Sequence, residues 1–228
     1  MDVSAILISL KTASLSIVIT FFLGVLAAFW VVSIRSRKLK TIIDGILTLP
    51  MVLPPTVAGF FLLYIFGVKR PIGSFLLEYL GVKIVFSWSA TVVAAVVISF
   101  PLMYRSARGA FEQVDQTLIH AARTIGMGEW AIFWRIIMPL ALPGVASGGI
   151  LAFARGLGEF GATAMIAGNI AGQTRTLPLA IYSAVAGGHM EDAYAYVLIL
   201  VGISFLVVLG MNWFTARERH WLGKGGNP

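Results

Sequence analysis

The sequence contains no cysteine and few charged residues. Without cysteine, disulfide bonds and thiol chemistry are excluded. Charged residues make up only 12% of the 228 residues, and the 10 acidic residues are outnumbered by 17 basic ones. Hydrophobic residues make up 58%, and the mean hydropathy is +0.90, both above the range of soluble globular domains. We therefore predict an all-α integral membrane protein with one transmembrane domain over residues 1–228 and no soluble domain.

A phosphate-binding loop is also missing. No G-x-x-x-x-G-K-[ST] run occurs, and the segment Gly223–Gly225 lacks both the earlier glycine and the hydroxyl residue of that motif. We therefore expect no catalytic residue, no metal site and no cofactor in this chain, and any ATP hydrolysis must come from another protein. The net charge of +7 does not indicate nucleic-acid binding, because the basic residues lie in short clusters beside apolar stretches.

Apolar stretches of the length needed to cross a bilayer recur along the chain. A spanning helix needs about 20 residues at a rise of 1.5 Å each. We predict five transmembrane helices, over about 3–34, 42–68, 86–104, 136–168 and 193–214. Basic clusters follow the first, third and fifth stretches, and Lys and Arg are enriched in cytoplasmic loops. This orientation places the N-terminus outside, the segment 169–190 outside and the C-terminus in the cytoplasm, with the first helix retained instead of cleaved as a signal peptide.

The second stretch contains the segment Leu49–Pro55, which is rich in proline. Pro50, Pro54 and Pro55 remove three backbone donors and must bend or break the helix. Irregular backbone inside a bilayer requires protein or water beside it. These prolines are therefore candidates for the gate of a pathway across the membrane.

The polar segment 109–135 contains a short amphipathic helix. Asp115 can cap its N-terminus, and Gly126 can end it in the left-handed conformation. Spacing at i, i+3, i+4 and i+7 predicts one apolar stripe made of Leu118, Ala121, Ala122 and Ile125. The small residues in this stripe suit docking into a groove of a soluble partner. Packing against the protein's own helix ends is the alternative that the pattern leaves open.

This segment resembles the Glu-Ala-Ala loop of bacterial ABC import permeases, with the pattern E-A-A-x₃-G-x₉-I-x-L-P. The match runs over twenty residues, although His120 replaces the glutamate and Met138 the leucine. In that family the loop is the coupling helix that docks into a cytoplasmic ATPase, which binds ATP and Mg²⁺. The resemblance implies that the coupling residues are His120, Ala121, Ala122, Arg123, Gly126, Ile136 and Pro139.

A second resemblance covers the segments 154–163 and 168–178 and the proline segment Leu49–Pro55. They are similar to the molybdate and sulfate permeases, and the run Pro178–Tyr182 is most similar to molybdate permeases. The resemblance implies the type I ABC importer permease fold in the cell (inner) membrane. It also implies a second copy of this chain, an ATPase dimer, an extracytoplasmic oxyanion-binding protein and surrounding lipid as partners.

The expected function is import of a tetrahedral oxyanion, molybdate or tungstate, with sulfate or thiosulfate as the alternative within the family. Two other classes of membrane protein are alternatives. An ion-coupled carrier would need several acidic residues in its spans and an internal repeat, and a membrane enzyme would need clustered acids or histidines at a membrane face. The sequence shows none of these features.

Arg155 and Glu159 are the charged pair of the fourth predicted span. They lie four residues apart, on one face of a helix, and buried charges in a span face the protein interior or a water-filled cavity. Either Arg155 contacts a passing anion, or the pair is a structural bridge. The bridge is favoured, because a permanent cationic site would retain a dianion that must leave quickly.

Overall fold

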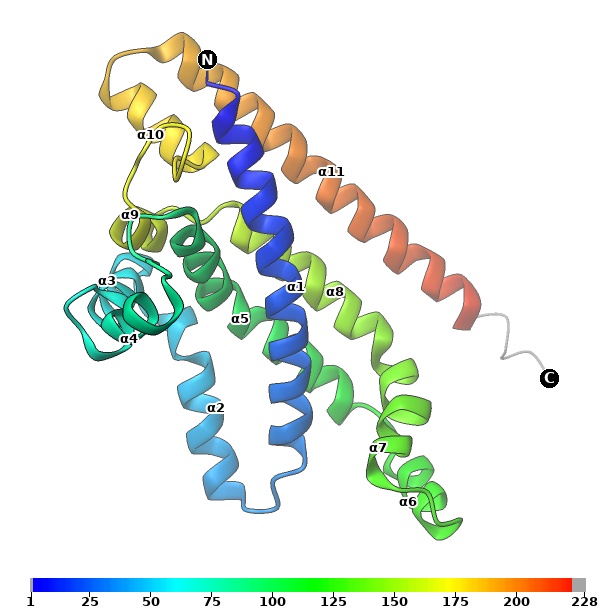
Figure 1. Ribbon diagram of the computed structural model, residues 1–228. Coiled ribbons are helices and arrows are strands. Elements are labelled where there is room, and N and C mark those ends of the chain that lie inside the picture. The colour runs from blue at the N-terminus through cyan, green and yellow to red at the C-terminus, as the bar shows by residue number, and fades with distance from the viewer. Residues whose placement is uncertain (1, 223–228) are drawn as a thin grey trace.

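The computed structural model describes residues 2–222, with side chains described to residue 210, and all regular elements in this range are helices (Figure 1). In chain order they are α1 (Ser4–Val32), α2 (Arg37–Val52), α3 (Pro55–Phe66), α4 (Pro71–Leu80), α5 (Trp88–Glu112), α6 (Gln116–Thr124), α7 (Glu129–Ile132), the π-helix η1 (Phe133–Ile137), α8 (Met138–Leu157), α9 (Gly161–Ala167), α10 (Leu177–Ala186) and α11 (Met190–Leu222).

Several of these helices are long and apolar enough to cross a membrane. Among the described residues, α1, α5, the continuous unit 129–157 and α11 each qualify, and α2 with α3, which are bent by 109° from each other, make a fifth if the pair is counted as one span. The predicted all-α class with about five spans is confirmed. The segments around 35–40 and 109–135, both predicted to be cytoplasmic, lie at one end of the molecule, and the N-terminus and α10 lie at the other (Figure 1).

The centre of the molecule is the contact of α5 with α1 and α8. Small residues let these backbones approach closely: a Cβ at Gly24 of α1 would lie 2.6 Å from Met103 Cγ, and one at Gly148 of α8 would lie 2.4 Å from Ser106 Cβ. Hydroxyl pairs add interhelical hydrogen bonds, Thr12 with Thr91 at 2.9 Å and Thr20 with Ser99 at 3.2 Å. Thr12 and Thr20 of the first span thus serve helix packing.

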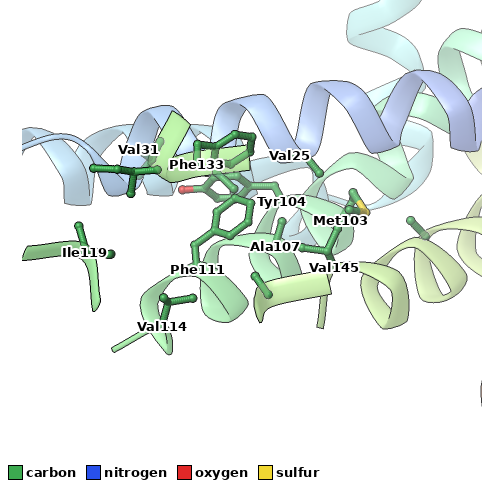
Figure 2. Packing of buried hydrophobic residues seen from close by; sticks show 14 of the residues in the cluster. Val25, Val31, Met103, Tyr104, Ala107, Phe111, Val114, Ile119, Phe133 and Val145 are labelled. Atoms are coloured by element: carbon green, nitrogen blue, oxygen red, sulfur yellow. The ribbon is translucent and has the colours of Figure 1, made fainter. Parts of the chain in front are cut away.

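An aromatic cluster fixes the loop segment 109–135 to this centre. Phe133 lies between the ends of α1 and α5, with ring-centroid distances of 4.4 Å to Phe29 and 5.7 Å to Phe111. Tyr104 and Ile119 of the same cluster are also buried (Figure 2). The loop is therefore a packed part of the fold, tied to the spans through apolar contacts.

The structure corrects several predicted boundaries. The third span continues to Glu112, so that the first four residues of the predicted polar segment 109–135 are helical. Two segments between the predicted spans contain short helices that were not predicted: α4, which ends at Gly81 with φ of +63°, and α10. The last span starts at Met190 and its backbone stays helical to Leu222, beyond the predicted end at 214. The fourth span, predicted as one helix to residue 168, ends at Leu157 and gives way to α9.

Candidate coupling helix and candidate pathway

The short helix α6 forms where the sequence predicts it. The N-terminal cap is confirmed, because Thr117 donates its backbone N–H to Asp115 Oδ1 at 2.8 Å. Hydrogen bonds from the Thr117 backbone lower the pKa of the Asp115 carboxyl. Gly126 follows the helix with φ of +82°, the left-handed conformation predicted for it. Both ends of the helix are thus set by single residues.

The two faces of α6 differ from the predicted single stripe. Ala122 is 3% exposed and packs inward with Ile119 against the aromatic cluster. Leu118 and Ile125 are 47% and 78% exposed, and Ala121 between them is exposed as well. The prediction of one stripe is wrong because Ala122 does not lie on the open face. The larger Ile119 points inward, and Ala122, three residues later, lies on the same inward face. One face of α6 thus packs on the protein itself, and docking of the open face into a partner stays a prediction.

The other predicted coupling residues surround this open face without belonging to it. His120 is exposed on the same helix. Arg123 donates to Glu129 at the start of α7, with 2.7 Å between Nε and Oε1 and 3.0 Å between Nη2 and Oε2. This bidentate pair fixes the angle between α6 and α7. A role for Arg123 in binding an ATPase stays a prediction, and its guanidinium is already engaged within the chain.

Ile136 and Pro139 lie where the helix that begins with α7 continues through η1 into the span α8. Ile136 packs on the aromatic cluster from η1, and Pro139 is the second residue of α8. Proline has no N–H to bond the carbonyl four residues earlier, and Met138 just before it donates to Phe133 at a spacing of five residues. The π-helix therefore accommodates Pro139. These two residues shape the base of the loop instead of its open face.

The proline segment breaks the second span as predicted. The break lies at Leu53 and Pro54, both extended, and Pro55 is the first residue of α3. Pro50 lies inside α2, which continues past it to Val52. Pro54 and Pro55 therefore mark the bend, and Pro50 does not.

Glu159 lies in a second break, which sequence reasoning missed. The prediction that Arg155 and Glu159 share one continuous helix is wrong, since Glu159 follows the end of α8. Its Oε1 accepts the backbone N–H of Ala162 at 2.8 Å and so caps α9. Its Oε2 lies 2.9 Å from Arg155 Nη1, an ion pair without hydrogen-bond geometry. The carboxylate is 2% exposed. Because it accepts the N–H of Ala162 at the start of α9, it stabilises a chain that leaves α8 at Leu157 and enters a new helix.

The structure brings the two breaks together. A Cβ at Gly161 of α9 would lie 3.0 Å from Pro55 Cβ, and one at Gly59 of α3 would lie 2.7 Å from Ala162 Cα. Irregular backbone of each broken span is thus covered by the other. Pro55 and Glu159, predicted separately as pathway candidates, flank one contact between α3 and α9. Gly59 and Gly161 were the missed signals, because glycine marks close backbone approach.

A further group of charged residues was not predicted to be a site. Arg108 of α5 forms ion pairs with Asp44 of α2 and, at 3.0 Å, with Glu112. Lys40 lies 2.8 Å from Glu112, and the Tyr104 hydroxyl donates to Asp44 at 2.9 Å. This cluster, which we call the α2–α5 clasp, holds α2 to α5 near the loop. The spacing of Arg108 and Glu112 at i and i+4 was the available signal.

Comparisons with known proteins agree with this arrangement. The family model for binding-protein-dependent transport system inner membrane components matches residues 20–220. The molybdenum transport system permease protein ModB of Escherichia coli (strain K12) is 41% identical over 96% of each chain. ModB of Haemophilus influenzae is 39% identical over 99% of this chain and 98% of the relative, and that of Azotobacter vinelandii is 39% identical over 92% of each.

Solved structures share the fold at lower identity. A chain of the MetNI methionine ABC transporter, in an inward-facing conformation, gives a TM-score of 0.73 at 18% identity, with 94% of each chain covered. A bacterial ABC transporter involved in the import of the acidic polysaccharide alginate gives 0.73 at 17% identity over 94% of this chain and 79% of the other. With the type I ABC importer permease fold and relatives that match almost its whole length, the chain belongs to the family of binding-protein-dependent transport system inner membrane components.

Proposed function

We propose that this chain is the membrane-spanning subunit of an ABC importer that carries molybdate into the cytoplasm. The observation that carries the proposal is the agreement with relatives named as molybdenum transport permeases, about 40% identical along nearly the full length of both chains. Substrate choice between molybdate, tungstate and sulfate rests mainly on an extracytoplasmic binding protein, since all three are tetrahedral dianions. This chain supplies the pathway and the coupling to ATP.

Coupling runs through the open face of α6. Leu118, Ala121 and Ile125 present an apolar strip with a small residue at its centre, which suits a groove on an ATPase subunit. Two copies of this chain bind two ATPase subunits, because five spans are too few to enclose a pathway alone. The ATPases hold ATP and Mg²⁺, and this chain is not itself an enzyme.

The pathway lies beside the two broken spans. Pro54, Pro55 and Glu159 stand where α3 meets α9, and irregular backbone at such depth is found next to protein or water. Arg155 is neutralised by Glu159, so that a passing dianion meets no unpaired cation at this point. The loop end of the molecule faces the cytoplasm and the N-terminus faces outward, following the basic clusters.

Uptake of labelled molybdate tests the substrate. Proteoliposomes would contain this chain with its ATPase, the binding protein outside and ATP inside. We expect uptake that excess tungstate suppresses and excess sulfate does not. Stronger suppression by sulfate than by tungstate would assign the chain to sulfate import and reject molybdate as the substrate.

A further inference from the structure

Two adjoining cavities lie at the α6 end of α5. The larger, of about 680 Å³, is an open groove bounded by α5, the start of α6 and α8. The smaller, of about 220 Å³, lies between α5 and the Asp44 region of α2. Arg105 and Gly109 line both cavities. The two cavities therefore meet along one strip of the α5 surface.

This strip is polar, unlike the outer surface of the neighbouring helix. Arg105 and Gly109 lie one turn apart, on the side of α5 away from its buried residues Ala107 and Phe111, and Gln113 follows one turn later, just after the helix ends. Ile42 and Ile46 on α2 are 60% and 64% exposed, as lipid-facing residues are. A polar strip at the end of a span indicates contact with water instead of lipid. Ser106 and Gln113 add neutral donors to the larger cavity.

Arg105 carries the uncompensated charge of this region. In the α2–α5 clasp, two acids, Asp44 and Glu112, are paired with two bases, Arg108 and Lys40. Asp115, at the edge of the larger cavity, is engaged as the cap of α6. Arg105 is exposed, and within residues 2–210 it has no ion-pair or hydrogen-bond partner. Its guanidinium is free to accept a ligand.

We propose that Arg105 is a release-side binding site for the transported oxyanion. A guanidinium presents paired N–H donors that match two oxygens of a tetrahedral dianion. Because Arg105 is open to water, the contact is weak and brief, so it attracts the anion without retaining it. The paired Arg155 deeper in the pathway lacks this free charge. This inference rests on the proposed function, since it requires that an oxyanion crosses the chain.

A phospholipid headgroup phosphate has the same chemistry, and the test must separate the two sources. The chain has no cysteine, so Arg105→Cys introduces its only thiol. That variant would be reconstituted with cysteine-free partners, and uptake would be measured before and after reaction with a cationic aminoethyl, an anionic sulfonatoethyl or a neutral methyl methanethiosulfonate. Arg37→Cys is the matched control, because Arg37 is an exposed cation at the start of α2 that lines neither cavity.

We expect Arg105→Gln and Arg105→Cys to lower the initial uptake rate by about three- to tenfold, the scale on which one charge changes the approach of an ion. Only the cationic reagent should restore uptake. In wild type the advantage over Arg105→Gln should shrink as salt rises, because salt screens an exposed charge. The Arg37→Cys variant should keep its rate throughout. ATPase stimulation by the loaded binding protein should persist in Arg105→Gln.

Four results would overturn the inference. Wild-type rates in Arg105→Gln, or equal recovery with all three reagents, would show that the charge does not act on the anion. A loss of uptake that appears only in vesicles with anionic phosphatidylglycerol, and vanishes in phosphatidylcholine, would assign Arg105 to lipid. If wild type moves no tetrahedral dianion at all, the proposed function fails along with the inference, and this is seen before any variant is compared.

Discussion

At the residue scale, the buried carboxylate of Glu159 stabilises the break between α8 and α9. One oxygen caps α9 through Ala162, and the other lies against Arg155. A carboxylate that is 2% exposed is costly to bury unless its charge is compensated. Arg155, which is 34% exposed, compensates it from the last turn of α8. The structural bridge considered from sequence therefore operates within one chain, and a contact of Arg155 with the anion stays a prediction.

The pair gives a double-mutant test. Glu159→Ala and Arg155→Ala should each lower the free energy of unfolding by about 1–3 kcal/mol, less than for a fully buried pair because Arg155 is partly exposed. The double variant should lose less than the two single losses combined, because each single variant leaves one charge without its partner and the double variant leaves none. Thermal unfolding of the purified chain in detergent measures this. Unchanged stability in Arg155→Ala together with lost uptake would instead favour Arg155 as an anion contact.

At the element scale, α6 has one face for the protein and one for a partner. Ala121 and Ala122 are neighbours in sequence but lie on different faces, exposed and 3% exposed respectively. The same bulky substitution at the two positions therefore tests two different contacts.

Ala121→Trp should prevent co-purification of the ATPase while the chain itself stays as stable as wild type. Ala122→Trp should destabilise the chain by about 1–3 kcal/mol, because overpacking forces the aromatic cluster apart. Co-purification and thermal unfolding would be measured for both variants. Normal ATPase binding by Ala121→Trp would show that the open face of α6 is not the docking surface.

The spans and the cap of α6 could be predicted because their signals are local. Apolar length, basic clusters, Asp115 and Gly126 each act within one element. The break at Glu159 and the inward turn of Ala122 depend on tertiary partners, Ala162 in one case and the aromatic cluster in the other. The helices α4 and α10 were not predicted because 10 residues are too few for a span.

The contact of α3 with α9 gives a prediction with a matched control. Gly59→Ala should lower the free energy of unfolding by about 1–3 kcal/mol and reduce uptake, because its Cβ would lie 2.7 Å from the Ala162 backbone. Gly45→Ala in α2 adds the same methyl group where nothing lies within 4 Å, and it should be neutral or slightly stabilising. Thermal unfolding and uptake assays compare them. Equal behaviour of the two variants would show that the α3–α9 contact is not required.

At the scale of the whole molecule, the two broken spans, the α2–α5 clasp, the Arg105 strip and α6 are all parts of one chain. The broken spans meet at α3 and α9. The α2–α5 clasp joins α2 to α5, and the Arg105 strip lies on the part of α5 that leads into α6. The helix α6 lies at the end of the molecule opposite the N-terminus (Figure 1). Glu112, the last residue of α5, belongs to the clasp and lies four residues before the start of α6. The clasp thus joins α5, which leads into α6, to α2, which ends at the bend at Pro54.

The energy source of uptake tests the central claim most directly. Molybdate uptake would be measured in proteoliposomes that contain this chain with its ATPase and binding protein, with ATP, without ATP, and with an imposed proton or sodium gradient in place of ATP. We predict uptake only with ATP, blocked by vanadate and absent when the ATPase is left out. Uptake that an ion gradient drives without the ATPase would contradict the account and make the chain an ion-coupled carrier.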